Sequence, residues 1–143
     1  MENEIITDTA STAEKANSTG KGRILVMDDD KMLRQVLSEM LKYIGYEVVC
    51  ACDGEKSIEL YQEAKMMNKP FDVVIMDLTI PGGLGGKETI KELLKIDANV
   101  KAIVSSGYSN DPVMAHYDKY GFKGLVAKPF SIEEIAQVLI EVI

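Results

Sequence analysis

Five short apolar segments alternate along this chain with segments of helical periodicity, and this pattern limits the possible folds more than any other feature. The apolar segments are residues 23–27, 47–51, 72–76, 101–105 and 124–127. Each has the length of one strand, and residues 72–76 place apolar side chains on both faces. Short connections between strands and helices imply right-handed crossovers and a parallel sheet that is covered on both sides. The sequence therefore predicts a doubly wound α/β fold.

The segments between these strands have helix signals at their ends. Apolar residues recur at helical spacing in 32–44, and Gly45 stands where the residue after a helix is often a glycine. Asp53 is positioned to cap a second helix, and residues 112–120 predict a short fourth helix. The segment Ser131–Glu134 has the capping-box pattern that opens a last helix.

The start of the chain differs in composition from the rest. Residues 1–21 are rich in Ser, Thr, Ala, Asn and Glu and have no sustained period. Such a segment buries too little apolar surface to offset the entropy lost on ordering. We therefore expect a disordered tail or linker at 1–21 and one domain at 22–143. The chain of 143 residues is 46% hydrophobic, which suffices for a single core.

Charge and hydropathy exclude two classes of partner. The net charge is −7, so the chain lacks the basic surface that nucleic-acid binding requires. No apolar run approaches the roughly 20 residues of a membrane span, and no signal peptide follows Met1. We expect a soluble, cytoplasmic protein without direct contact to nucleic acid or membrane.

The cysteines and the histidine do not suggest a site. Cys50 and Cys52 form a lone C-x-C without a second Cys or His pair, so we interpret them as two small buried thiols. His116 is the only histidine and has no partner for metal or triad chemistry. We interpret it as a surface residue.

Polar residues follow the predicted strands at the ends where ligands bind in doubly wound folds. The carboxyl ends of parallel strands share one edge of the sheet, and ligands bind beyond it at the switch in strand order. Three carboxylate positions, a hydroxyl and a lysine would meet there. The residues at these ends are Asp28, Asp29, Asp30, Asp53, Asp77, Ser105, Ser106 and Lys128.

Four motifs resemble the response-regulator receiver family of two-component signalling, and the resemblance covers Gly22 to Ile143. The motifs are Ile24–Asp29, Val74–Gly82, Ile103–Gly107 and Val126–Phe130. The resemblance implies a flavodoxin-like five-stranded parallel sheet of order 2-1-3-4-5. It also implies a domain that accepts a phosphoryl group from the phosphohistidine of a histidine kinase.

The resemblance assigns a role to each residue of the set. Asp77 matches the phosphoacceptor, Lys128 the lysine that contacts the phosphate, and Ser106 the switch hydroxyl. Ser105 is the alternative for that hydroxyl, but Ser106 keeps the expected spacing to Lys128. The family also suggests a cis peptide bond between Lys128 and Pro129.

For the metal, the resemblance implies Asp28, Asp29, Asp77 and the main-chain carbonyl of Thr79 as ligands. Two carboxylates about 4 Å apart repel by roughly 1 kcal/mol in water and about 4 kcal/mol at an effective dielectric of 20. A divalent cation reverses that sign. A set of oxygen ligands suits Mg²⁺, with Mn²⁺ also possible, and does not suit Zn²⁺.

Three other functions fit parts of the pattern. In a haloacid-dehalogenase-like phosphatase, Asp28 would be the nucleophile and Asp30 the acid/base, but Asp77 and Lys128 would have no role. An FMN carrier of this fold class would have its flavin phosphate repelled by the aspartates. An unphosphorylated interaction module would not need the full set. As an isolated domain the chain would catalyse only its own phosphorylation and dephosphorylation.

The resemblance extends to receivers at the C-terminal end of hybrid sensor histidine kinases. The segments that suggest this are Gly20–Arg23, Ile80–Gly86 and Ser105–Ser109. A histidine kinase or phosphotransfer domain would donate the phosphoryl group. No output domain follows Ile143, so we expect the signal to leave through the face formed by the helix at 112–120, the strand at 124–127 and the last helix. Leu125 replaces the aromatic residue of many receivers, which leaves Ser106 as the expected switch element.

Overall fold

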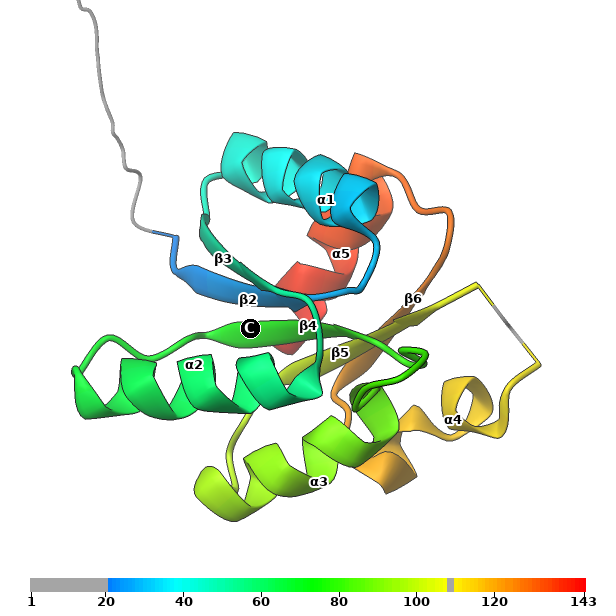
Figure 1. Ribbon diagram of the computed structural model, residues 1–143. Helices are drawn as coiled ribbons and strands as arrows, with labels where there is room; N and C mark the ends of the chain where they lie inside the picture. Colours follow the sequence, from blue (N-terminus) through cyan, green and yellow to red (C-terminus); the bar gives the residue numbers. More distant parts are fainter. Residues whose placement is uncertain (1–20, 108–109) are drawn as a thin grey trace, which may run out of the picture.

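A five-stranded parallel sheet forms the centre of the structure (Figure 1). The structure is a computed structural model that describes residues 21–107 and 110–143. The spatial order is β3-β2-β4-β5-β6. Because β2 is the first strand along the chain, this is the order second, first, third, fourth and fifth, which confirms the predicted order 2-1-3-4-5. Nearly all of the predicted tail, residues 1–20, lies outside the described residues. The strands are β2 (Arg23–Met27), β3 (Glu47–Ala51), β4 (Val73–Asp77), β5 (Ala102–Ser106) and β6 (Gly124–Ala127).

Two strands begin and end one residue later than predicted. The sheet pairs Asp77 with Ser105 and Ser106 with Ala127, so both polar residues belong to their strands. Asp72 lies before β4, and its carboxylate accepts the Arg23 N–H at 2.7 Å. The strand register thus places Asp77 and Ser106 at the ends of neighbouring strands.

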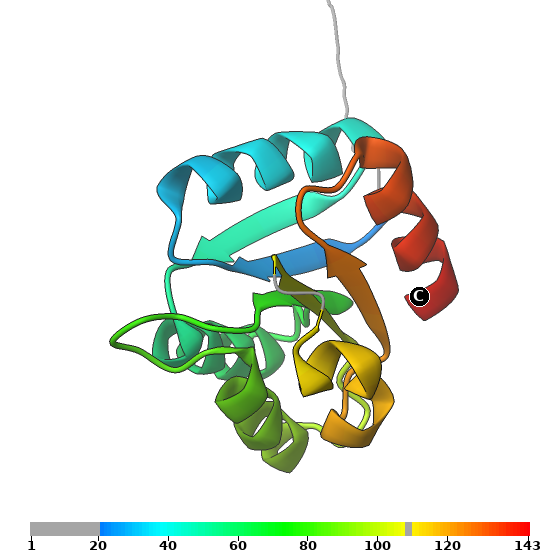
Figure 2. The same ribbon diagram turned by 90° about the vertical axis from the view of Figure 1, so that its right-hand side faces the viewer.

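Helices cover both faces of the sheet (Figure 2). One face is covered by α1 (Lys31–Ile44) and α5 (Ile132–Val142), and the other by α2 (Gly54–Met66), α3 (Gly86–Ile96) and α4 (Pro112–Ala115). Side chains alternate between two apolar clusters along each central strand, as in β5, where Ile103 faces α1 and α5 while Val104 faces α2 and α3. None of the helices in the described ranges is long and apolar enough to cross a bilayer.

The predicted helix ends agree with the structure. Asp53 caps α2 by accepting the Lys56 N–H at 2.9 Å, and Gly45 ends α1 with φ 124°. Ser131 and Glu134 form both bonds of a capping box. These local signals determine helix ends because they satisfy backbone groups that have no partner within the helix.

The fourth helix is not continuous, and this prediction was wrong. It ends at Ala115 and is followed by a 3₁₀ helix, η2 (Tyr117–Tyr120), because His116 has φ −130° and ψ 43°. A 3₁₀ turn brings residues three positions apart onto one side. Tyr117 and Tyr120 accordingly both pack against the cluster beneath α3. His116 is exposed, as predicted.

The interpretation of the two cysteines as buried thiols was also wrong. Cys50 and Cys52 are free and exposed. Cys50 belongs to β3, which lies at the edge of the sheet and has no neighbouring strand on one side among the described residues, and Cys52 follows the end of that strand. An apolar run therefore does not ensure burial when its strand lies at an edge.

Candidate functional site

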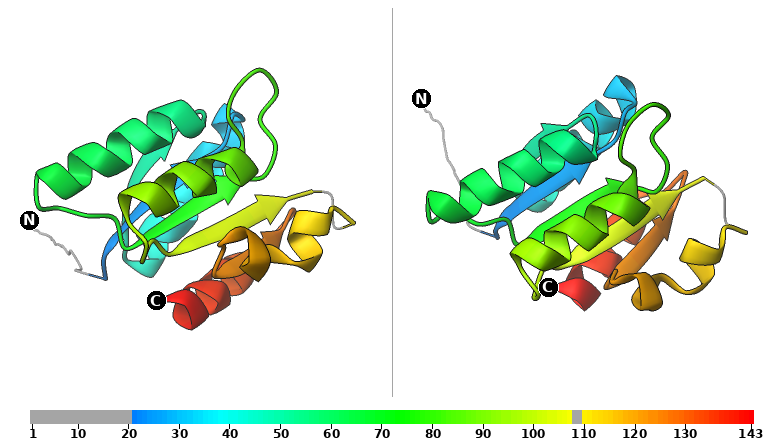
Figure 3. Two further views of the ribbon diagram at one scale, coloured as in Figure 1. Left: turned by 90° about the horizontal axis from the view of Figure 1, so that it is seen from below. Right: turned by 60° about the horizontal axis from the view of Figure 1, so that its bottom comes forward.

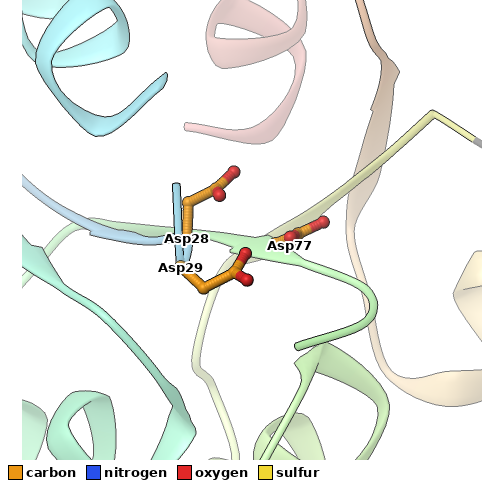
Figure 4. Close-up of side chains that lie close together, drawn as sticks. All are labelled: Asp28, Asp29 and Asp77. Atoms are coloured by element: carbon orange, nitrogen blue, oxygen red, sulfur yellow. The ribbon is translucent and has the colours of Figure 1, made fainter. Parts of the chain in front are cut away.

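The carboxyl ends of the five strands point toward one edge, where the β4–α3 loop rises above the sheet (Figure 3). Asp28 and Asp29 follow β2, and Asp77 ends the adjacent strand β4. One carboxylate oxygen of each lies within 4.8 Å of the other two (Figure 4). Asp28 is buried and Asp29 is exposed, so the cluster opens toward solvent. The structure thus brings together the three carboxylates of the sequence analysis.

Hydrogen bonds hold the turn that bears the acidic pair. The Asp28 N–H donates to the Ala51 carbonyl at 3.1 Å, and the Asp30 N–H donates to Asp28 Oδ1 at 2.9 Å. Arg34 Nη1 donates to the Asp28 carbonyl at 2.7 Å. Sequence reasoning did not single out Arg34, although its place in the second turn of the helix that follows Asp30 brings it back over this turn. These bonds hold the turn in place and fix one oxygen of the Asp28 carboxylate.

Lys128 supplies the positive charge of the site. Its Nζ lies 2.9 Å from Asp28 Oδ2 and 3.3 Å from Asp77 Oδ1. Its backbone N–H donates to the Ser106 carbonyl at 2.9 Å, which fixes the residue beyond β6. The bond between Lys128 and Pro129 is cis, as the resemblance suggested.

The electrostatic environment shifts two pKa values in the site. Burial raises the pKa of Asp77; Lys128 opposes this shift, and the charges of Asp28 and Asp29 add to it. Burial alone would lower the pKa of Lys128, but its bond to Asp28 and the charge of Asp77 raise it overall. The ammonium therefore stays charged, whereas the ionised form of Asp77 is destabilised.

An open cavity of about 470 Å³ lies beside Asp77. Asp77 and Lys128 line it, together with Ser106, Thr79 and Pro81. Ser106 faces this cavity, whereas Ser105 lines a different and smaller one below. Of the two candidate hydroxyls, the structure therefore places Ser106 beside the open side of Asp77.

The other polar residues at this edge have structural roles. The Asp30 carboxylate accepts the N–H groups of Met32 and Leu33 at the start of α1. Asp53 caps α2 and lies outside the carboxylate cluster. A carboxylate occupied as an N-cap is poorly placed as an acid/base, which argues against the phosphatase alternative.

Comparison with known proteins agrees with this geometry. The family described as the response regulator receiver domain matches residues 24–140, and the chain belongs to this family. The chemotaxis protein CheY of Thermotoga maritima is 35% identical over 118 residues, which cover 82% of this chain and 93% of that protein. The chain is therefore a receiver domain of two-component signalling.

Two solved structures have the same fold. The chemotaxis protein CheY4 of Vibrio cholerae has a TM-score of 0.76 at 27% identity, covering 85% of this chain and 98% of that one. The receiver domain of a sensor histidine kinase from Pseudomonas aeruginosa has a TM-score of 0.74 at 22% identity, covering 85% and 96%. At that identity the second likeness concerns the fold alone.

Replacing Asp77 with Asn should raise the melting temperature of the metal-free protein at pH 7 by a few degrees. The pKa of Asp77 in the folded protein lies above its ordinary value of 3.8, so stability is lost as the pH rises from there through the raised pKa. The amide side chain of the variant does not ionise, so the variant does not lose stability over this pH range. The difference between the two melting temperatures, measured in EDTA, should therefore grow over that window and then stay constant. A variant that melts below wild type at every pH would contradict this account.

Proposed function

We propose that this domain accepts one phosphoryl group onto Asp77 from a phosphohistidine, in a reaction that depends on Mg²⁺. The observation that supports this most directly is the open cavity that Asp77 lines together with Lys128 and Ser106. The Asp77 side chain is 12% exposed, so it is accessible from that cavity and otherwise enclosed. A carboxylate in this position can attack a phosphoryl group in line, and its neighbours can then stabilise the transferred charge.

The donor atoms near Asp77 suit Mg²⁺. Asp28, Asp29 and Asp77 offer carboxylate oxygens only. Thr79 lines the open cavity beside Asp77. Hard oxygen ligands with room for water favour Mg²⁺ or Mn²⁺ over Zn²⁺. When bound, the cation supplies positive charge for the phosphoryl oxygens and relieves the repulsion between the carboxylates. The P. aeruginosa receiver that shares the fold has a magnesium ion coordinated in its active site cleft.

Two residues of the chain, Lys128 and Ser106, contact the phosphoryl group itself. Lys128 holds a phosphoryl oxygen with its ammonium and orients the group for attack. Ser106 donates its hydroxyl to another oxygen once the group is on Asp77. Both contacts are charge-assisted, which makes them stronger than bonds between neutral groups.

The partners follow from this chemistry. A histidine kinase or a phosphotransfer domain supplies the phosphoryl group, and a downstream protein reads the face formed by α4, β6 and α5. The receiver spans residues 22–143 and acts in the cytoplasm. It belongs to a hybrid sensor histidine kinase, a proposal supported by the motifs that resemble such receivers and by the P. aeruginosa neighbour, which comes from a sensor histidine kinase.

A small-molecule phosphodonor with Mg²⁺ should add one acid-labile phosphoryl group to the wild-type protein. Asp77→Asn should abolish the addition, because the amide cannot form the acyl phosphate. Asp53→Asn is a matched control, since it removes a carboxylate at the same edge of the sheet and keeps a side chain that caps helices. Intact mass spectrometry measures the addition. Equal labelling of wild type and Asp77→Asn would refute the assignment of the acceptor.

Asp29→Ala should weaken Mg²⁺ binding by at least about tenfold, because it removes one of three clustered carboxylates and its charge. Isothermal titration of the unphosphorylated protein measures the affinity. Asp118→Ala is the control, since Asp118 is an exposed acid in η2. Similar affinities for the two variants would remove Asp29 from the metal site.

The switch depends on Ser106, which links the cavity to the output face. Ser106 lines the cavity and pairs with Ala127 of β6. Movement of its hydroxyl toward the phosphoryl group would shift the loop from Gly107 to Pro112, of which Tyr108 and Ser109 lie outside the described residues. A charge-assisted bond of about 1.5–3 kcal/mol suffices to make a minor state dominant.

Ser106→Ala should therefore uncouple the output face from the site. Amide chemical shifts with and without a beryllofluoride phosphate mimic measure the response of α4, β6 and α5. In wild type these elements should shift on binding, and in the variant the shifts should remain close to Asp77. A distal response as large as that of wild type would show that another element couples the site to this face.

A further inference from the structure

A second, smaller cavity lies on the side of the sheet that α1 and α5 cover. Its volume is about 10 Å³, and its apolar wall comes mainly from α1 and β2. Asp77 and Lys128 line this cavity as well as the open one above. The residues that matter for its chemistry are Asp28, Asp77, Ser105 and Lys128.

Ser105 gives this cavity an unexpected polar group. Its side chain is on the face of β5 that also bears Ile103, two residues earlier, which packs in the apolar cluster beneath α1 and α5. Ser105 is 3% exposed, and its Oγ has no hydrogen-bond partner among the described residues. Buried hydroxyls are nearly always paired, because an unpaired one loses its bonds to water. We therefore expect the Ser105 hydroxyl to have a hydrogen-bond partner within the cavity that it lines.

Lys128 offers a matching donor. An ammonium group has three N–H donors. Two of them face oxygens of Asp28 and Asp77, at 2.9 Å and 3.3 Å. In the described part of the chain no acceptor contacts the third. The ammonium of Lys128 and the hydroxyl of Ser105 thus border the same small cavity without a hydrogen bond between them.

We propose that this cavity holds one water molecule, which accepts from Lys128 and bonds to Ser105 Oγ. A cavity of about 10–15 Å³ on this measure accommodates one water, and a buried water needs two to four polar partners. Ser105 is then a positioning residue: acting through the water, it fixes the ammonium of Lys128 between Asp28 and Asp77. This inference rests on the proposed function, in which Lys128 orients the phosphoryl group.

The pair Ser105→Thr and Ser105→Val isolates the hydroxyl, because the two new side chains have almost the same shape and only Thr keeps the oxygen. At saturating Mg²⁺, Ser105→Val should phosphorylate about tenfold more slowly than Ser105→Thr, the size of effect that supporting contacts have in other sites. Ser105→Thr should recover most of the wild-type rate. Mg²⁺ affinity should differ less than about twofold between the variants, because the Ser105 hydroxyl has no hydrogen bond to any of the three carboxylates.

Two further measurements separate positioning from a general loss of structure. Urea unfolding should show Ser105→Val at least as stable as Ser105→Thr, because Val buries no hydroxyl. A high-resolution crystal structure of the wild-type protein should show a water between Ser105 Oγ and Lys128 Nζ. Equal phosphorylation rates for the Thr and Val variants, or a dry cavity in that structure, would overturn the inference.

Failure of the proposed function would look different. If wild-type protein gained no phosphoryl group on Asp77, both the proposed function and the positioning role of Ser105 would be refuted. The crystal structure would still decide whether the water is present. If phosphorylation occurred normally and the two variants did not differ, only the role of Ser105 would fall.

Discussion

The repulsion between three carboxylates at one edge of the sheet is the constraint on which the site depends. Asp28, Asp29 and Asp77 come within 4.8 Å of one another because their strands are neighbours. Such a cluster is tolerated only with positive charge nearby, and Lys128 provides it from the far side of β5. The same repulsion favours any divalent cation that enters. The charges of Asp28 and Asp29 accordingly help to raise the pKa of Asp77.

The hydrogen bonds around the cluster explain how a short turn bears this charge. Arg34 donates to the carbonyl of Asp28, and the carboxylate of Asp30 is bound by the first turn of α1. Of the three consecutive aspartates, Asp30 is thus committed to the helix, while Asp28 and Asp29 remain for the site. The division of roles within the run Asp28–Asp30 follows from helix capping, since a helix N-terminus attracts a negative side chain.

Ser105 and Ser106 show how one strand serves two environments. Successive side chains of a strand point to opposite faces. Ser106 lines the open cavity and pairs with β6, which belongs to the proposed output face. Ser105 lines the smaller cavity beside α1. Two adjacent hydroxyls thus flank Asp77 from its exposed side and its buried side, and they connect it to different parts of the core.

Local patterns in the sequence determined the elements, the α/β class and the residues at the strand ends, because periodicity and capping depend on near neighbours along the chain. The family motifs added the strand order and the cis bond at Pro129. Only the tertiary structure decided how these parts contact each other. In the structure β4 includes Asp77, and the fourth helix ends before His116. Cys50 is exposed at the edge of the sheet. The ammonium of Lys128 lies closer to Asp28 than to Asp77. Each of these depends on distances between strands and helices that are far apart in the sequence, and no local pattern specifies such distances.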